Sequence, residues 1–89
     1  MALARRAVVH GRVQGVFFRD TVRRAAKQRG VAGWAANRAD GTVEVWLEGE
    51  TDGVESMLRV LRDGPPRAQV ERVDVDEVEP EGLSAFEIR

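Results

Sequence analysis

A chain of 89 residues is long enough for one domain with one hydrophobic core, so residues 1–89 are interpreted as a single domain. Its hydrophobic fraction of 43% and charged fraction of 33% are typical of a folded globular protein, and no apolar run approaches the roughly 20 residues of a membrane span. The absence of cysteine excludes disulfides, thiolate metal sites and a cysteine nucleophile.

The net charge of −1 conceals an uneven distribution along the chain. Residues 1–39 carry nine Lys or Arg against one acidic residue, a balance of +8, whereas residues 40–89 carry five Arg against fourteen acidic residues, a balance of −9. Halves of opposite charge would steer a small anion toward the N-terminal half, unless the fold interleaves them and cancels the field.

The first six residues lack an apolar stretch after their arginines, so we expect no signal peptide and a cytoplasmic location.

The first predicted strand covers residues 4–13, where apolar and polar residues alternate. A helix is predicted over residues 18–29, because apolar residues recur there at helical spacing and Gly30 is placed to end it. His10 is the only histidine and lies in the predicted strand. Without a Ser, Cys or carboxylate in a recognisable arrangement, we expect a structural or surface role for it rather than general-base catalysis.

The loop between this strand and helix is the most informative segment of the sequence. Its backbone can turn successive N–H groups inward to make a concave nest for an anion, and the helix N-terminus adds unpaired N–H groups and the positive end of its dipole. Gly15 permits the positive φ that such a loop needs, and Arg19 stands where its guanidinium can bind the same anion. Glycine-rich turns before helices are common, so the spacing alone is weak evidence for a phosphate site. Phe17 and Phe18 are expected to be core anchors that hold the loop rigid.

Two strands joined by a tight turn are predicted next. Residues 32–38 and 42–48 are rich in β-forming residues, and the Asp-Gly pair between them is a strong hairpin signal. Trp34 and Trp46 lie on the paired strands and are expected to form a cross-strand packing pair.

A second helix is predicted to begin at Asp52, which with Glu55 three residues later resembles a capping box. Apolar residues at positions i, i+3, i+4 and i+7 form a core-facing stripe, and the Gly-Pro-Pro sequence at residues 64–66 ends the helix. The stripe consists of Val54, Met57, Leu58 and Leu61.

The last predicted strands cover residues 69–78 and 86–89. Val70 is out of step with the alternation of Val73 and Val75, which indicates a β-bulge. The order strand, helix, strand, strand, helix, strand predicts an α+β ferredoxin-like βαββαβ sandwich. In this fold two helices pack on one face of an antiparallel sheet, here with a short extra C-terminal strand.

Two segments resemble the signatures of the acylphosphatase family. Residues 11–19 read Gly-Arg-Val-Gln-Gly-Val-Phe-Phe-Arg, and residues 33–38 read Gly-Trp-Ala-Ala-Asn-Arg, with Asp-Gly-Thr-Val-Glu-Val at residues 40–45. The similarity spans nearly the whole chain. The resemblance implies the same ferredoxin-like fold and a hydrolase that converts an acyl phosphate to a carboxylate and inorganic phosphate, with no cofactor and no metal.

The resemblance also implies roles for particular residues. Arg19 would bind the phosphate, Asn37 would position the attacking water, and backbone amides would form a phosphate cradle. The phosphate-binding residues would be Gln14, Gly15, Val16, Phe17, Phe18 and Arg19. Judged from the residue alone, an Asn near a strand end more often serves only the following turn. The expected partners are an acyl phosphate substrate and inorganic phosphate, as product and inhibitor; we expect a monomer that binds no nucleic acid and no membrane.

The residue chemistry agrees with this reaction. A carboxylate whose conjugate acid has a pKa of about 4 leaves without a general acid. A loose phosphoryl-transfer transition state needs charge stabilisation and alignment, which an arginine and converging amides supply without a metal. Asn37 cannot accept a proton as a base would, so the proton of the attacking water would pass to a phosphoryl oxygen.

Two other functions stay open on the sequence. Some ferredoxin-like domains bind RNA on the open sheet face, but the strands here lack a dense aromatic and basic pattern, and the C-terminal half is acidic. Alternatively, the chain is an accessory or regulatory domain that kept the cradle, since acylphosphatase-like domains also occur inside larger enzymes. The presence of both Arg19 and Asn37 favours the catalyst.

Overall fold

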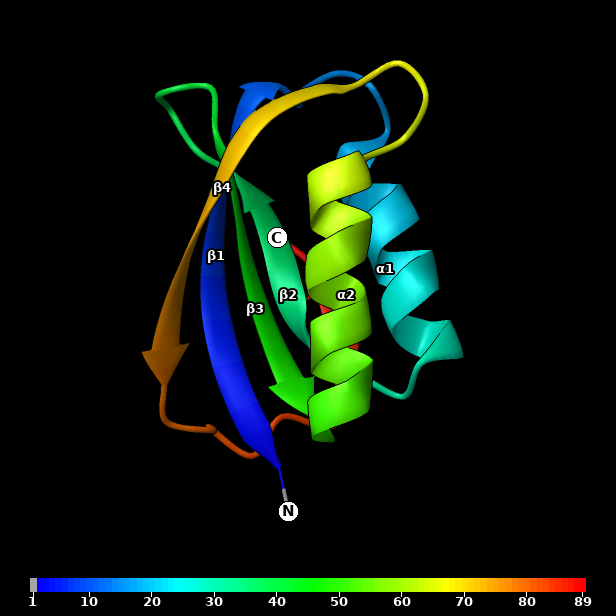
Figure 1. The fold of residues 1–89 in the computed structure, drawn as a ribbon, viewed down its shortest axis with the longest axis vertical. Coiled ribbons are helices and arrows are strands. Elements are labelled where there is room, and N and C mark those ends of the chain that lie inside the picture. Colours follow the sequence, from blue (N-terminus) through cyan, green and yellow to red (C-terminus); the bar gives the residue numbers. More distant parts are fainter. Residues whose placement is uncertain (1) are drawn as a thin grey trace.

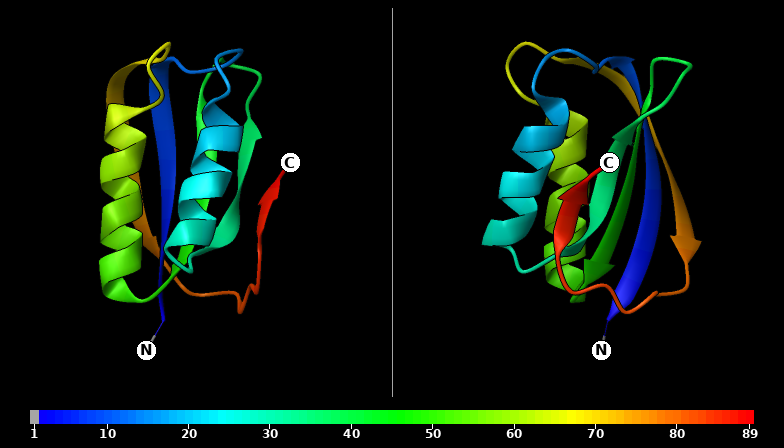
Figure 2. Two further views of the ribbon diagram at one scale, coloured as in Figure 1. Left: turned by 90° about the vertical axis from the view of Figure 1, so that its right-hand side faces the viewer. Right: turned by 180° about the vertical axis from the view of Figure 1, so that it is seen from behind.

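Residues 2–89, the part of the chain that the computed structural model describes, form a five-stranded sheet with two helices on one face (Figures 1 and 2). Met1 of the N-terminal segment lies outside the described residues. The elements are β1 (Leu3–Arg12), α1 (Phe18–Gln28), β2 (Ala32–Asn37), β3 (Val43–Gly49), α2 (Thr51–Asp63), β4 (Gln69–Val78) and β5 (Phe86–Ile88). Neither helix within residues 2–89 has the length and apolar character needed to cross a membrane.

The sheet order β4-β1-β3-β2-β5 confirms the predicted ferredoxin-like architecture. β1 pairs antiparallel with β3 and β4, and β2 pairs antiparallel with β3. The short extra strand β5 joins the edge of the sheet parallel to β2, and Figure 2 shows it beside that strand. The C-terminal end of the chain therefore lies against β2 and α1 rather than at the far edge beside β4.

Both helices bury one apolar stripe against the sheet. The stripe predicted for α2 is confirmed, with Leu58 at its partly buried border. Burial of a large apolar side chain contributes roughly 1.5–3 kcal/mol, so packing rather than intrinsic propensity holds these short helices. The buried residues of the two helices are Phe18, Val22, Ala26, Val54, Met57 and Leu61, and those of the facing strands include Ala7, Val9, Ala35, Val43, Val45 and Leu47.

The start of α2 differs from the prediction. Glu50 is the N-cap, with extended backbone at φ −66° and ψ 150°, and Thr51 is the first helical residue. Asp52 therefore lies inside the first turn, where its charge interacts favourably with the helix dipole. The capping-box prediction is wrong, because it placed the cap two residues too late.

A β-bulge lies where β1 runs out into the following loop, which confirms the bulge predicted from Val70. The register shifts after His10, which pairs with Arg72. Gly11 pairs with Val70, so Glu71 is the extra residue on β4. Gly11 has φ 127°, and a Cβ there would lie 2.0 Å from a backbone oxygen of β4. Glycine at this position lets the two strands approach closely while the chain turns toward α1.

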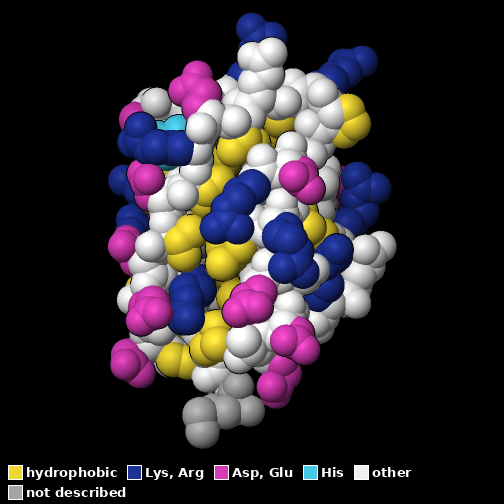
Figure 3. Space-filling model, viewed as in Figure 1, with side chains coloured by type: hydrophobic (Ala, Val, Ile, Leu, Met, Phe, Trp, Pro, Cys, Tyr) yellow, Lys and Arg dark blue, Asp and Glu magenta, His cyan; other side chains and the backbone are white. Residues whose placement is uncertain are grey.

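The fold interleaves the two oppositely charged halves of the chain. β1, from the basic half, lies between β3 and β4, and Arg5 pairs with Glu77 at 3.6 Å. Arg6 pairs with Glu44 on β3 and, at 3.4 Å, with Asp76 on β4. Figure 3 shows basic and acidic side chains interspersed on the face that carries α2. Of the two alternatives, interleaving is the one that the structure supports.

A buried carboxylate fixes the segment that delivers β5. Trp34 and Trp46 stack with ring centroids 6.3 Å apart and planes at 19°, which confirms the predicted pair. The Nε1–H of Trp46 donates to Glu48 Oε1 at 2.9 Å. Glu48 is 4% exposed, and its carboxylate also accepts hydrogen bonds from the backbone amides of residues 81–83 at 2.7 to 2.8 Å. Because residues 81–83 connect β4 to β5, the Glu48 carboxylate holds this connection against β3.

Burial alone would raise the pKa of Glu48, but the hydrogen bonds from Trp46 and from the amides of residues 81–83 outweigh it and hold the pKa below its ordinary value of 4.5. A carboxyl group whose folded pKa is lowered stabilises the protein above its unfolded pKa. This stabilisation is lost as the pH falls through the folded pKa, so Glu48 contributes to acid unfolding.

Glu48→Gln is expected to lower the free energy of unfolding at pH 7 by about 2–3 kcal/mol, because it removes charge-assisted hydrogen bonds and sets an amide NH₂ against backbone donors. It should also reduce the loss of stability on acidification from about pH 5 to about pH 3. Urea unfolding at a series of pH values measures both effects. Glu79→Gln removes the same charge from an exposed position and serves as the control. An acid dependence equal in the two variants would contradict the role of Glu48.

Candidate active site

The loop between β1 and α1 is anchored in the core at both ends. Val13 and Phe18 are 1% and 2% exposed, which confirms that Phe18 is a core anchor, and Gly15 adopts φ 73°. The expectation that Phe17 is a second anchor is wrong, because its side chain is 76% exposed. Phe17 is the N-cap of α1 in a left-handed conformation, with φ 60° and ψ 26°, and this backbone turns its ring out of the core.

The backbone amides of residues 14–20 share one feature: none of them donates to an acceptor within residues 2–89. The first hydrogen bond of α1 runs from the amide of Thr21 to the carbonyl of Phe17, at 3.0 Å. The left-handed Phe17 followed by the right-handed Phe18 is the backbone alternation that makes an anion-binding nest. Together with the positive end of the α1 dipole, this loop offers a set of donors to an anion.

The Gln14 side chain fastens this loop to the β2–β3 hairpin. Its Nε2 donates to the backbone carbonyls of Arg38 at 2.7 Å and of Thr42 at 2.9 Å. The hairpin is closed by Asp40 Oδ1, which accepts from the Thr42 hydroxyl at 2.6 Å and amide at 3.0 Å; these bonds hold the pKa of Asp40 below its ordinary value. Because Asn37 is the last residue of β2, Gln14 sets the position of the loop relative to Asn37.

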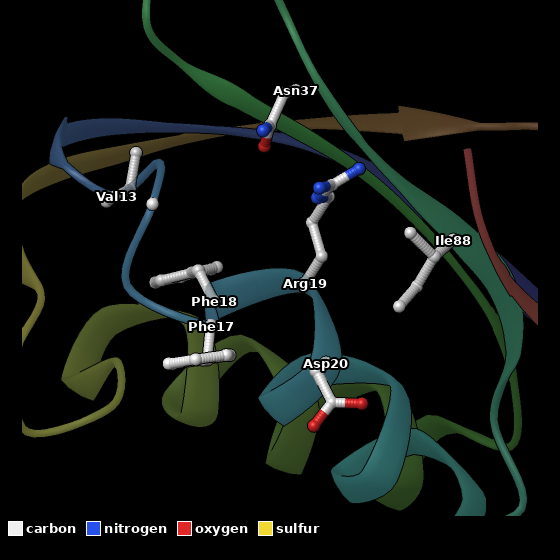
Figure 4. Close-up of a pocket in the computed structure, with 8 residues that line it drawn as sticks. Val13, Phe17, Phe18, Arg19, Asp20, Asn37 and Ile88 are labelled. Carbon is white, nitrogen blue, oxygen red and sulfur yellow. The ribbon is translucent and has the colours of Figure 1, made fainter.

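Arg19 and Asn37 face each other across a cavity of about 290 Å³ (Figure 4). The Arg19 side chain rises from the first turn of α1, and the Asn37 side chain projects toward it from the end of β2. Arg19 Nη1 donates to the backbone oxygen of Arg89 at 3.1 Å, which ties the guanidinium to the end of the chain after β5. The cavity is lined by Val13, Gly15, Phe17, Phe18, Arg19, Asp20, Asn37 and Ile88.

The structure brings most of the predicted site residues into this one cavity. Those that line it are Gly15, Phe17, Phe18, Arg19 and Asn37. Gln14 and Val16 belong to the same loop, but the Gln14 side chain binds the hairpin and Val16 lines a neighbouring hollow with Pro65 and Pro66. Any contact of Gln14 or Val16 with an anion in the cavity therefore falls to their backbone amides.

Two residues that line the cavity, Asp20 and Ile88, are not predicted as site residues by any pattern in the sequence. Asp20 follows Arg19, and its carboxylate pairs with Arg23 at 2.9 Å and Arg24 at 3.1 Å, which balances its charge on the helix surface. Ile88 reaches the cavity from β5 through the pairing of that strand with β2. Among residues 2–89, no group of three or more His, Asp or Glu side chains is placed to hold a metal ion. The lining itself offers an anion three kinds of donor: the Arg19 guanidinium, the backbone amides of the loop and the carboxamide NH₂ of Asn37.

Comparison with known proteins gives a consistent result. A model of the acylphosphatase family matches residues 5–88. The acylphosphatase of Rubrobacter xylanophilus is 50% identical over 86 residues, which cover 94% of this chain and 77% of that protein. The crystal structure of acylphosphatase from Bacillus subtilis matches with a TM-score of 0.95 at 40% identity and covers 98% of each chain. Full-length HypF, solved in a phosphate- and nucleotide-bound form, matches with a TM-score of 0.92 at 30% identity, over 100% of this chain and 12% of HypF.

Gln14→Ala is expected to lower the free energy of unfolding by about 1–2 kcal/mol, because two hairpin carbonyls lose their side-chain donor. Gln14→Glu should cost more, since a carboxylate would face the same two carbonyl oxygens. Gln28→Ala, a matched change at an exposed position near the end of α1, should stay within about 0.5 kcal/mol of wild type. Urea denaturation measures all three, and equal stability of the Gln14 and Gln28 variants would contradict the fastening role of Gln14.

Proposed function

The chain belongs to the acylphosphatase family, and from this premise we propose that its Arg19 cavity hydrolyses the carboxyl–phosphate bond of acyl phosphates to a carboxylate and inorganic phosphate. One observation carries the proposal. Arg19 and Asn37 lie on opposite sides of a single cavity, next to a row of backbone amides that have no acceptor within residues 2–89.

The phosphoryl group is held by backbone and guanidinium together. The proposed cradle consists of the amides of Gln14, Gly15, Val16, Phe17, Phe18 and Arg19. The guanidinium of Arg19 offers a planar fork of N–H donors that matches two phosphoryl oxygens. Because the loop is anchored at Val13 and Phe18 and fastened through Gln14, these donors are in place before the substrate arrives. Fixed donors stabilise developing charge without reorganising during the reaction.

Asn37 positions the attacking water. Its carboxamide oxygen accepts a hydrogen bond from water, and its NH₂ donates one to the substrate or to a second water. The water oxygen forms a bond to phosphorus as the bond from phosphorus to the acyl oxygen breaks, and the carboxylate leaves with the bonding electron pair. Asn37 takes no proton, so the proton of the water passes to a phosphoryl oxygen of the substrate. The leaving carboxylate needs no general acid, because its conjugate acid has a pKa of about 4.

Three further properties follow from this mechanism. The reaction needs no metal, since Arg19 and the amides supply the positive charge. Inorganic phosphate presents the same oxygens to the same donors as the substrate, so it acts as a competitive inhibitor. All proposed groups belong to one chain, which supports a monomeric enzyme. Turnover that survives an excess of chelator and is inhibited competitively by phosphate would agree with the first two properties.

Arg19→Lys is expected to lower kcat/KM for benzoyl phosphate about 10³–10⁵-fold, because an ammonium group cannot reproduce the bidentate fork. Steady-state hydrolysis in the presence of chelator measures the loss. Arg59→Lys makes the same substitution at an exposed position of α2, outside the cavity lining, and should leave the activity unchanged. A loss smaller than about tenfold in Arg19→Lys would remove Arg19 from the mechanism.

Asn37→Ala is expected to lower kcat about 10²–10³-fold, because the water would lose its fixed orientation in the transition state. The KM for benzoyl phosphate and the inhibition constant for inorganic phosphate should change little, since the phosphate donors stay in place. The same steady-state assay, with a urea unfolding curve to verify the fold, tests both statements. Turnover near that of wild type would show that Asn37 serves only the hairpin.

A further inference from the structure

Large hydrophobic side chains are exposed at two positions among residues 2–89, Phe17 and Ile88. Ile88 is 36% exposed, and both residues line the cavity that contains Arg19 and Asn37. Figure 4 shows them on either side of Arg19, with Phe17 on the loop before α1 and Ile88 on β5. Exposed apolar residues scattered singly need no explanation, but these two flank one cavity. Apolar side chains gathered at a cavity mark a binding surface.

The backbone of Phe17 is a second, independent observation. Phe17 is the single non-glycine residue with a positive φ in the described part of the chain. This conformation strains an aromatic residue, whereas glycine or asparagine adopts it more readily. The nest requires the left-handed backbone at this position but not an aromatic side chain, and a ring that is 76% exposed adds little to the core, so neither the nest nor folding accounts for the Phe17 ring. Strain of this kind collects at ligand sites, where the side chain has a contact to make.

The polar groups of the cavity leave the two flanks of Arg19 to apolar contacts. Under the proposed function, Arg19 and the amides of residues 14–19 bind the phosphoryl group. The Asp20 carboxylate is engaged by two arginines of α1 and does not offer a free partner for the acyl group. Asn37 is also exposed and is assigned to the attacking water. Beyond the polar groups, Phe17 and Ile88 form the exposed apolar part of the lining.

We propose that Phe17 and Ile88 form an acyl subsite that favours acyl phosphates with an apolar, aromatic acyl group. The inference rests on the proposed function, since the phosphoryl group must occupy the amides for the acyl group to lie between these side chains. The Phe17 ring also borders the neighbouring hollow, lined in part by Val16, Pro65 and Pro66. Apolar surface therefore continues past Phe17, with room for an acyl group larger than acetyl.

The test compares kcat/KM for benzoyl phosphate with kcat/KM for acetyl phosphate in the same protein. Both substrates carry the same phosphoryl group, so a change in this ratio relative to wild type reports the acyl contact alone. Phe17→Asn removes the ring and tolerates the left-handed backbone, and Ile88→Thr keeps a β-branched side chain in the strand. In each variant we expect the ratio to fall about tenfold.

Phe17→Tyr and Ile88→Val are the matched controls, because they keep an aromatic ring and an aliphatic side chain; both should retain the wild-type ratio. A ratio within about twofold of wild type in Phe17→Asn and in Ile88→Thr would overturn the subsite. Wild-type protein that hydrolyses neither substrate would instead overturn the proposed function, so the two failures are distinguishable. Should Phe17→Asn lose its cooperative unfolding transition, Phe17→Gly, which also accepts a positive φ, takes its place under the same criterion.

Discussion

Two hydrogen bonds from one side chain, Gln14, hold the two parts of the candidate active site in register. The amide loop and Arg19 belong to the start of α1, whereas Asn37 belongs to the end of β2, and no covalent segment shorter than the helix joins them. Gln14 connects the two parts by donating to the carbonyls of Arg38 and Thr42, which belong to the β2–β3 turn that begins directly after Asn37. Backbone amides stabilise a phosphoryl group only if they are fixed relative to the incoming water, so this clamp is the constraint on which the site depends.

The other side of the site depends on where β5 lies. Glu48 holds the connection before β5 through backbone amides, and β5 then runs along β2 until the backbone oxygen of Arg89 accepts a hydrogen bond from Arg19. The Arg89 guanidinium lies 4.9 Å from the centre of the Trp34 ring, which steadies the same end of the strand. The Glu48 carboxylate, near the end of β3, thereby determines where β5 lies. The position of β5 in turn brings the backbone oxygen of Arg89 to the Arg19 guanidinium and places Ile88 in the cavity.

Local patterns in the sequence predicted the parts of the molecule that depend on local physics. Apolar spacing identified both helices, and turn chemistry identified the hairpin and the loop before Arg19, because these signals lie in consecutive residues. The bonds of Gln14 reach carbonyls 24 and 28 residues away, and Ile88 reaches the cavity only through strand pairing; no local pattern encodes either contact. Aromatic residues usually pack inward, which predicts a core position for Phe17, but the left-handed N-cap conformation overrides that tendency.

Binding of phosphate by the loop amides and Arg19 can be observed directly. Inorganic phosphate would be titrated into ¹⁵N-labelled protein while the chemical shift of every backbone amide is recorded. We expect saturable shifts centred on residues 14–19, with a single binding constant, and their loss in Arg19→Ala. If the amide signals of residues 14–19 do not shift, or if the shifts centre on the sheet face around Trp34, the amides at the start of α1 do not hold the phosphoryl group.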